Sequence, residues 1–240
     1  AGATWGVPAG NWSSSPDVPN YLNAQFSSIH YGGGGTFFFA GAGGILMRSV
    51  DYGATINYLS QAGLGGADVR CVAGLGTATD LVVGTLADGM WRSADAGATW
   101  AQILAVTDLI THIEVIGSTI LAFTVSGVWR STDYGTTWPT FPNTAILSGA
   151  YMGTDSSVIG THVFVTSDTG RFRSTDSGQT WTQQSSSGHL AVKALSAQIV
   201  LYVEGSNNAT YSANGGITTL PFAMGTYQGY AWTVEGHNYP

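Results

Sequence analysis

Charged side chains are scarce in this chain of 240 residues, since Asp, Glu, Lys and Arg together make up only 9% of it. Seven Lys and Arg stand against fourteen Asp and Glu, which gives a formal net charge of −7. A protein that binds nucleic acid needs a basic patch that neutralises phosphates. With so few basic residues, the sequence excludes nucleic acid as an expected partner.

Cysteine is nearly absent, and long apolar runs are absent altogether. The single Cys71 excludes a disulfide framework and a cysteine-based zinc site, and within VRCVAG it is expected to be a small buried hydrophobe. The five histidines are scattered without the spacing of a metal motif, so we predict no metal and no cofactor. No stretch of 18 apolar residues occurs, and membrane insertion is therefore not expected.

A nine-residue pattern with the core S-x-D-x-G-x-T-W recurs along the chain. It reads RSADAGATW at 92–100, RSTDYGTTW at 130–138 and RSTDSGQTW at 173–181, with looser copies at 48–56 and 211–219. The Asp carboxylate can accept hydrogen bonds from backbone N–H groups of its own turn, and the Gly supplies a positive φ. Each copy is therefore predicted to be a structural hairpin turn, centred on Asp51, Asp95, Asp133, Asp176 and Asn214.

The spacing of these turns predicts the architecture. Successive turn centres are 44, 38, 43 and 38 residues apart, and short apolar segments suited to four strands accompany each turn. A period near forty residues with four strands per unit is typical of a β-propeller. Residues 225–240 read as a sixth unit, and GATW at Gly2–Trp5 matches Gly97–Trp100. We predict an all-β fold: a six-bladed β-propeller of four-stranded antiparallel blades, one domain over 1–240, closed by the N-terminal strand joining the C-terminal blade.

The repeated turn resembles the Asp-box of bacterial neuraminidase repeats, which occurs in sialidases, xyloglucanases, sortilin-like receptors and photosystem assembly factors. The resemblance implies turns that shape propeller blades at a distance from the active site. It therefore speaks for the fold and leaves the function open.

Two enzyme classes follow from this resemblance, and the residues disfavour both. A sialidase resembling that family would need three arginines that clamp the substrate carboxylate. Outside the repeated turns only Arg70 and Arg171 remain, and the F-R-I-P segment is missing, so sialidase activity is not expected. Another glycoside hydrolase would need only two carboxylates. Asp68 and Asp108 are the nominated catalytic pair, but the preferred interpretation is that both are solvated loop carboxylates without a catalytic role.

In related propellers the ligand lies on the face opposite these turns, which implies a binding surface formed by loops of that face. A long non-repeating segment with three prolines follows the N-terminal strand and contributes aromatic residues to it. The predicted ligand-binding residues are Trp12, Tyr21, Asp68, Arg70, Asp108, His112, Tyr151, His189, Lys193 and Tyr227.

The favoured function is a non-enzymatic binding module that recognises a carbohydrate, as a lectin does, or a protein. The expected partner is a glycan or a surface protein, and the expected location is extracellular or at a cell or virion surface. One alternative is a structural or assembly component of a virion, tail or surface layer, which the low charge and the 34 glycines also fit. The second alternative is a glycoside hydrolase. The sequence leaves the oligomeric state open.

Overall fold

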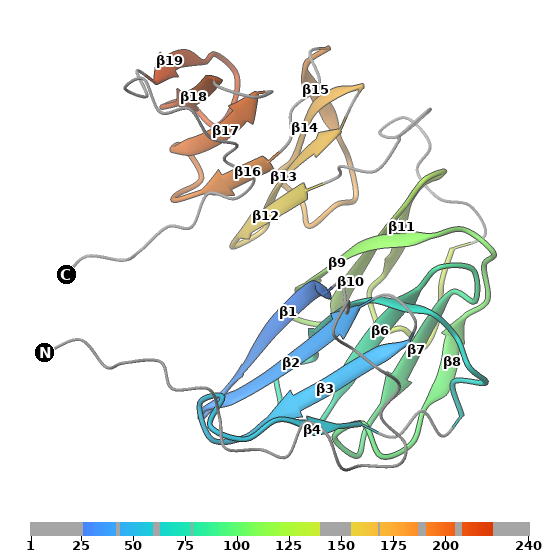
Figure 1. Ribbon diagram of the computed structural model, residues 1–240. Coiled ribbons are helices and arrows are strands. Elements are labelled where there is room, and N and C mark those ends of the chain that lie inside the picture. Colours follow the sequence, from blue (N-terminus) through green and yellow to red (C-terminus); the bar gives the residue numbers. More distant parts are fainter. Residues whose placement is uncertain are drawn as a thin grey trace, which may run out of the picture. The chain divides into compact units, whose positions relative to one another are not determined.

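The computed structural model describes residues 26–41, 44–59, 63–77, 79–139, 155–167, 169–186, 191–204 and 208–222 (Figure 1). Every regular element in these ranges is a β-strand, which confirms the all-β class. Accordingly, no membrane-spanning helix is found in them. The chain divides into two units, Ala1–Val106 and Thr107–Pro240, and a single domain over the whole chain stays a prediction.

The first unit contains two four-stranded antiparallel sheets, in which the strands pair in chain order. One sheet consists of β1 (Phe26–Gly33), β2 (Thr36–Gly41), β3 (Ile45–Ser49) and β4 (Asn57–Tyr58). The other consists of β5 (Val69–Gly74), β6 (Leu81–Thr85), β7 (Met90–Ser93) and β8 (Ala101–Leu104). Each sheet is thus a meander, as predicted for a repeat that contains three hairpin turns.

The second unit contains three antiparallel sheets. They are formed by β9 (Ile110–Ile116), β10 (Thr119–Thr124) and β11 (Gly127–Ser131), by β12 (Asp155–Ile159), β13 (His162–Ser167), β14 (Gly170–Ser174) and β15 (Thr182–Ser185), and by β16 (Ala191–Ala194), β17 (Val200–Glu204), β18 (Asn208–Ser212) and β19 (Leu220–Phe222). The first of these sheets has three strands among the described residues. Residues 136–139, at the end of its repeated turn, are not in a strand, and residues 140–154 lie outside the described ranges.

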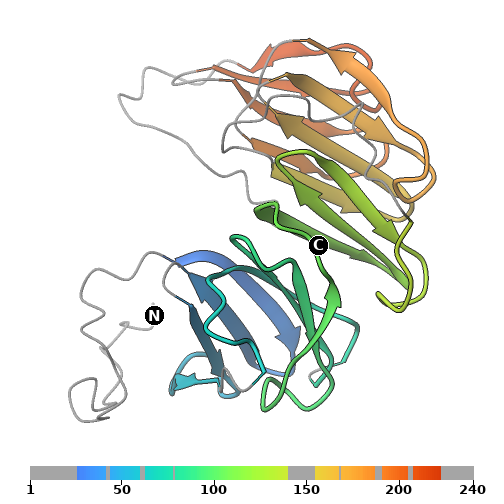
Figure 2. The same cartoon turned by 90° about the vertical axis from the view of Figure 1, so that its right-hand side faces the viewer.

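Neighbouring sheets within each unit pack face to face through apolar side chains (Figure 2). In the first unit Phe38 and Leu46 share a core cluster with Val83. In the second unit Phe164 of β13 shares one with Tyr202 of β17. Every residue of β6 and of β10 is buried, as a continuous apolar strand requires.

Side chains of one sheet also satisfy the free edge of the first strand in the next sheet. The imidazole Nε2 of His30 accepts a hydrogen bond from the backbone N–H of Gly74 at 3.0 Å. In the second unit the Asp155 carboxylate accepts one from the N–H of Val192 at 2.8 Å. A buried backbone N–H without a hydrogen-bond partner costs free energy. Because these bonds satisfy such groups from the neighbouring sheet, they also hold consecutive sheets in a fixed position relative to each other.

Cys71 lies on β5 and is only 3% exposed. Burial raises the pKa of its thiol to about 12. A thiol in this environment is protonated at neutral pH and packs as a small apolar side chain, as predicted.

Candidate functional site

The repeated turns share one hydrogen-bonding pattern, which the turn of Asp133 illustrates. Its Oδ1 accepts a hydrogen bond from the N–H of Thr137 at 2.9 Å, and its Oδ2 accepts one from the Thr137 hydroxyl at 2.6 Å. The Ser131 hydroxyl donates to the carboxylate and accepts from the N–H of Gly135. Equivalent carboxylate bonds occur at Asp51, Asp95 and Asp176. The carboxylate's hydrogen bonds thus lie within its own turn.

These bonds also act on the acidity of the carboxylates. The hydroxyl and the backbone N–H of the threonine four residues later, Thr99 or Thr137, lower the pKa of Asp95 and of Asp133 to about 2. Asn214 makes the same turn without a charge, since its Oδ1 accepts from the N–H of Thr218 at 3.0 Å. The turn therefore needs an acceptor oxygen at this position, and it forms with either an acid or an amide.

The structure describes five of the ten predicted ligand-binding residues. Asp68 and Arg70 belong to the first unit, whereas Asp108, His112 and Lys193 belong to the second. The other five lie outside the described residues: Trp12, Tyr21, Tyr151, His189 and Tyr227.

Asp68 and Arg70 form an ion pair at the start of β5. Arg70 Nη2 lies 2.9 Å from Asp68 Oδ2, and both side chains are about 30% exposed. The backbone N–H of Gly44 donates to Oδ1 of the same carboxylate at 3.4 Å. The two charged groups are therefore held together at a partly exposed position.

His112 belongs to a polar cluster on the first strands of two sheets in the second unit. Its Nε2 lies 3.5 Å from Oε1 of Glu114, and this oxygen accepts a hydrogen bond from the Ser156 hydroxyl at 2.9 Å. Burial opposes protonation of His112, but Glu114 and Asp155 outweigh it and raise the pKa of the imidazole above its ordinary value. For Asp155, by contrast, burial favours the protonated carboxyl group and raises its pKa above the ordinary value.

Sequence reasoning selected His112 but missed the two acids beside it. Glu114 follows His112 by two residues on β9, which places both on one face of the strand. That alternation was a usable signal. Asp155 comes from a segment about forty residues later, and only the packing of β12 beside β9 brings it to the cluster.

Lys193 and Asp108 are the two other predicted residues that the structure describes. Lys193 is half-buried on β16, directly after Val192. Asp108 is half-buried in the segment before β9 and forms no hydrogen bond with a described residue. The nominated hydrolase pair, Asp68 and Asp108, is divided between the two units.

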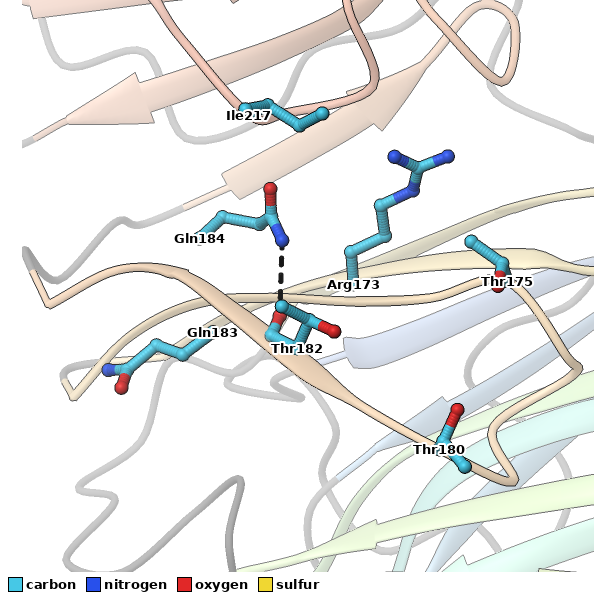
Figure 3. Close-up of a pocket in the computed structure, with 7 residues that line it drawn as sticks. All are labelled: Arg173, Thr175, Thr180, Thr182, Gln183, Gln184 and Ile217. Atoms are coloured by element: carbon cyan, nitrogen blue, oxygen red, sulfur yellow. Dashed lines mark hydrogen bonds between the residues drawn. The ribbon is translucent and has the colours of Figure 1, made fainter.

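A cavity of about 430 Å³ lies in the second unit, between β14, β15 and the turn that follows β18 (Figure 3). It is lined by Arg173, Thr175, Thr180, Thr182, Gln183, Gln184 and Ile217. The figure shows Arg173 and Gln184 extending from their sheet toward Ile217. Sequence reasoning missed this site because Arg173 belongs to a repeated turn and was assigned a structural role.

Metal binding finds no support in the described ranges, where no group of three or more His, Cys, Asp or Glu side chains comes together. The absence of a metal and of a cofactor stays a prediction.

Comparison with known proteins identifies the fold. Neither a protein-family model nor a curated protein matches the sequence. Among solved structures, YCF48 bound to a D1 peptide matches with a TM-score of 0.66 at 18% identity, over 85% of this chain and 69% of that one. The GH74 xyloglucanase from Xanthomonas campestris matches with a TM-score of 0.60 at 16% identity, over 82% of this chain and 38% of that one.

A third structure, of a nidogen–laminin complex, matches with a TM-score of 0.63 at 8% identity, over 87% of this chain and 83% of that one. Identities this low show the fold alone. The face-to-face antiparallel sheets and these likenesses together establish that the chain has a β-propeller fold.

Proposed function

We propose that this protein is a non-enzymatic binding module that recognises a glycan or a protein at a cell or particle surface. The observation that carries the proposal is the Asp68–Arg70 ion pair, with 2.9 Å between the charged atoms and about 30% exposure of each side chain. A preformed pair of this kind offers both a donor and an acceptor to a ligand without a conformational change. The carboxylate that a hydrolase would use is already bound to a guanidinium.

The similar structures support binding and leave an alternative. YCF48 was solved with a bound D1 peptide, and the nidogen structure is a protein complex. The Xanthomonas campestris protein is a xyloglucanase, which keeps glycoside hydrolysis as the second candidate. Because one fold supports both roles, the distinction rests on the residues of this chain.

Replacing Arg70 with alanine should weaken ligand binding at least ten-fold, as expected when a charge-assisted hydrogen bond is lost. The measurement is titration calorimetry with the ligand that a glycan array or a surface-protein screen identifies. A matched control is Arg48→Ala, which removes an arginine of a repeated turn and is expected to leave affinity unchanged. Equal affinity of Arg70→Ala and the unmodified protein would remove Arg70 from the site.

The hydrolase alternative makes an opposite prediction, which a screen of chromogenic glycosides tests. Turnover that disappears in Asp68→Asn or in Asp108→Asn would replace the binding proposal with an enzymatic one. No affinity for any glycan or surface protein, together with incorporation of the protein into a particle or surface layer, would favour the structural alternative.

We also propose that the repeated turns are Asp-boxes and that six blades close one domain over 1–240. The exposed face of the first sheet supports this closure, since Phe26, Ile29 and Tyr31 on β1 are 52%, 65% and 54% exposed. Apolar side chains on one strand call for a covering layer, and a closing blade would provide it.

Deleting residues 1–8 should therefore lower the melting temperature by at least ~2–4 °C, which corresponds to about 1 kcal/mol in a chain of this size. The loss of a closing strand would expose the edge of its blade. Differential scanning calorimetry of the full and the shortened chain gives the answer. Identical melting temperatures would contradict closure by the N-terminal strand.

A further inference from the structure

Four of the five repeated turns begin with an arginine, and this arginine has the same structural task in two of them. Arg48 Nη1 donates to the carbonyl oxygen of Ala96 at 3.2 Å, and Arg130 Nε donates to that of Ser177 at 2.9 Å. Each bond joins one sheet to the turn of the next sheet. Such an arginine is therefore a link between consecutive sheets.

Arg173 occupies the same place in its repeat but does not make this bond. Its Nε is buried and has no hydrogen-bond partner among the described residues. The guanidinium carbon of Arg173 lies 5.7 Å from the ring centroid of Phe164. A guanidinium can donate five hydrogen bonds, so Arg173 retains donors that the sheet packing does not use.

The reason lies in the next turn, where Gly215 replaces a residue with a side chain. The equivalent residues of the other turns have φ between 55° and 60°: Tyr52, Ala96, Tyr134 and Ser177. A Cβ at Gly215 would lie 2.6 Å from Nη1 of Arg173. Because Gly215 has no side chain, the Arg173 guanidinium can pack against this turn, at the edge of the cavity.

The cavity has the chemistry of a site for a polar, negatively charged ligand. Among the described residues of its lining, Arg173 is the one with a charge, and threonine hydroxyls and glutamine amides make up most of the rest. Gln184 makes only a long 3.5 Å bond, to the carbonyl oxygen of Thr182, so its amide can turn to a ligand. The volume of the cavity, about 430 Å³, is within the usual range for small-molecule sites.

We propose that this cavity binds an acidic sugar unit, whose carboxylate or sulfate pairs with Arg173. A guanidinium recognises such oxyanions through two parallel hydrogen bonds. Thr175, Thr182 and Gln184 can donate to and accept from the sugar hydroxyls, and the exposed Ile217 can cover one face of the ring. None of the described residues proposed above for ligand recognition lines this cavity, so we propose it as a second site.

The test is titration calorimetry of the full chain with three oligosaccharide series of equal length: galacturonate, sulfated galactose and neutral galactose. At least one acidic series should bind ten-fold or more tightly than the neutral series. Which acidic series binds identifies the oxyanion. Arg173→Gln should weaken that binding at least ten-fold, since charged hydrogen bonds contribute most in such sites.

Two further variants separate binding from folding. Arg130→Gln removes the equivalent arginine of the preceding repeat, outside the cavity, and should cost stability while retaining affinity. Gly215→Ala introduces the side chain that Ala96 carries at the equivalent position and should displace the guanidinium. A Cβ there also lies 2.9 Å from the carbonyl oxygen of Ala197, so melting curves must show that this variant is folded.

Three results would overturn the proposal. Equal affinity for neutral and acidic sugars would show that Arg173 does not select charge. Unchanged acidic-sugar binding in folded Arg173→Gln would place the site elsewhere. Arg173-dependent binding of an oligoglutamate peptide, with no binding of either acidic sugar series, would assign the cavity to an acidic protein partner.

Discussion

Replacing Arg171 with methionine is expected to raise the free energy of unfolding by about 1–3 kcal/mol, because it removes a buried charge that forms no ion pair with a described residue. Arg171 is only 6% exposed, and its Nε and Nη1 are buried without hydrogen-bond partners. The ring of Tyr202, 4.7 Å from the guanidinium carbon, offsets part of this cost through a cation–π contact.

The repeats themselves show which residue type suits this position. Leu46, Met90 and Val128 occupy the equivalent place in three other sheets, and their exposed fractions are 1%, 0% and 3%. An apolar side chain is thus the usual solution in this protein. Methionine is close to arginine in length and adapts to irregular space, so Arg171→Met should leave the packing intact.

Denaturant unfolding of Arg171→Met and of the reverse change, Met90→Arg, measures the effect. The first should raise the unfolding midpoint, and the second should lower it by burying a charge at an apolar position. A lower midpoint for Arg171→Met would mean that the guanidinium contributes more through its contacts than its burial costs.

Asp133→Ala is expected to lower the free energy of unfolding, because the hydrogen bonds that hold the turn lose their acceptor. The alanine would leave the N–H and the hydroxyl of Thr137 and the hydroxyl of Ser131 without their acceptor. The change should not alter ligand binding, because those bonds belong to the turn.

Asp133→Asn is the matched control, since Asn214 already performs the same task in the last turn. Its amide oxygen accepts from the Thr218 N–H at 3.0 Å, and its Nδ2 donates to the Thr218 hydroxyl at 2.8 Å. The asparagine variant should keep most of the stability that alanine loses. If Asp133→Ala lost ligand binding at undiminished stability, the turn would have a functional role.

Low pH should reduce the stability of the unmodified protein more than that of the Asp133→Asn variant. The pKa of Asp133 falls from 3.8 to about 2 on folding. A lowered pKa contributes stability above pH 3.8 that is lost as the pH falls through about 2. Between these values the unmodified protein should therefore lose more stability than Asp133→Asn, which has no proton to bind there.

The sequence by itself determined the local structure of this protein. An acceptor side chain, a glycine and flanking hydroxyls within nine residues specify each turn, because the side-chain hydrogen bonds of the turn join residues at most four positions apart. The strands on either side follow from apolar segments bounded by such turns. The all-β class and the antiparallel order of strands within a sheet could therefore be predicted without a structure.

Packing between sheets, which no local pattern encodes, decided the rest. Arg171 and Arg173 alternate along β14 as any strand residues do, and only the packing of the sheets buries the Nε atom of each without a hydrogen-bond partner among the described residues. The Glu114–Ser156 hydrogen bond likewise joins residues 42 positions apart. Burial and charge pairing depend on which strands become neighbours, so the cavity at Arg173 and the cluster at His112 appear only in the folded chain.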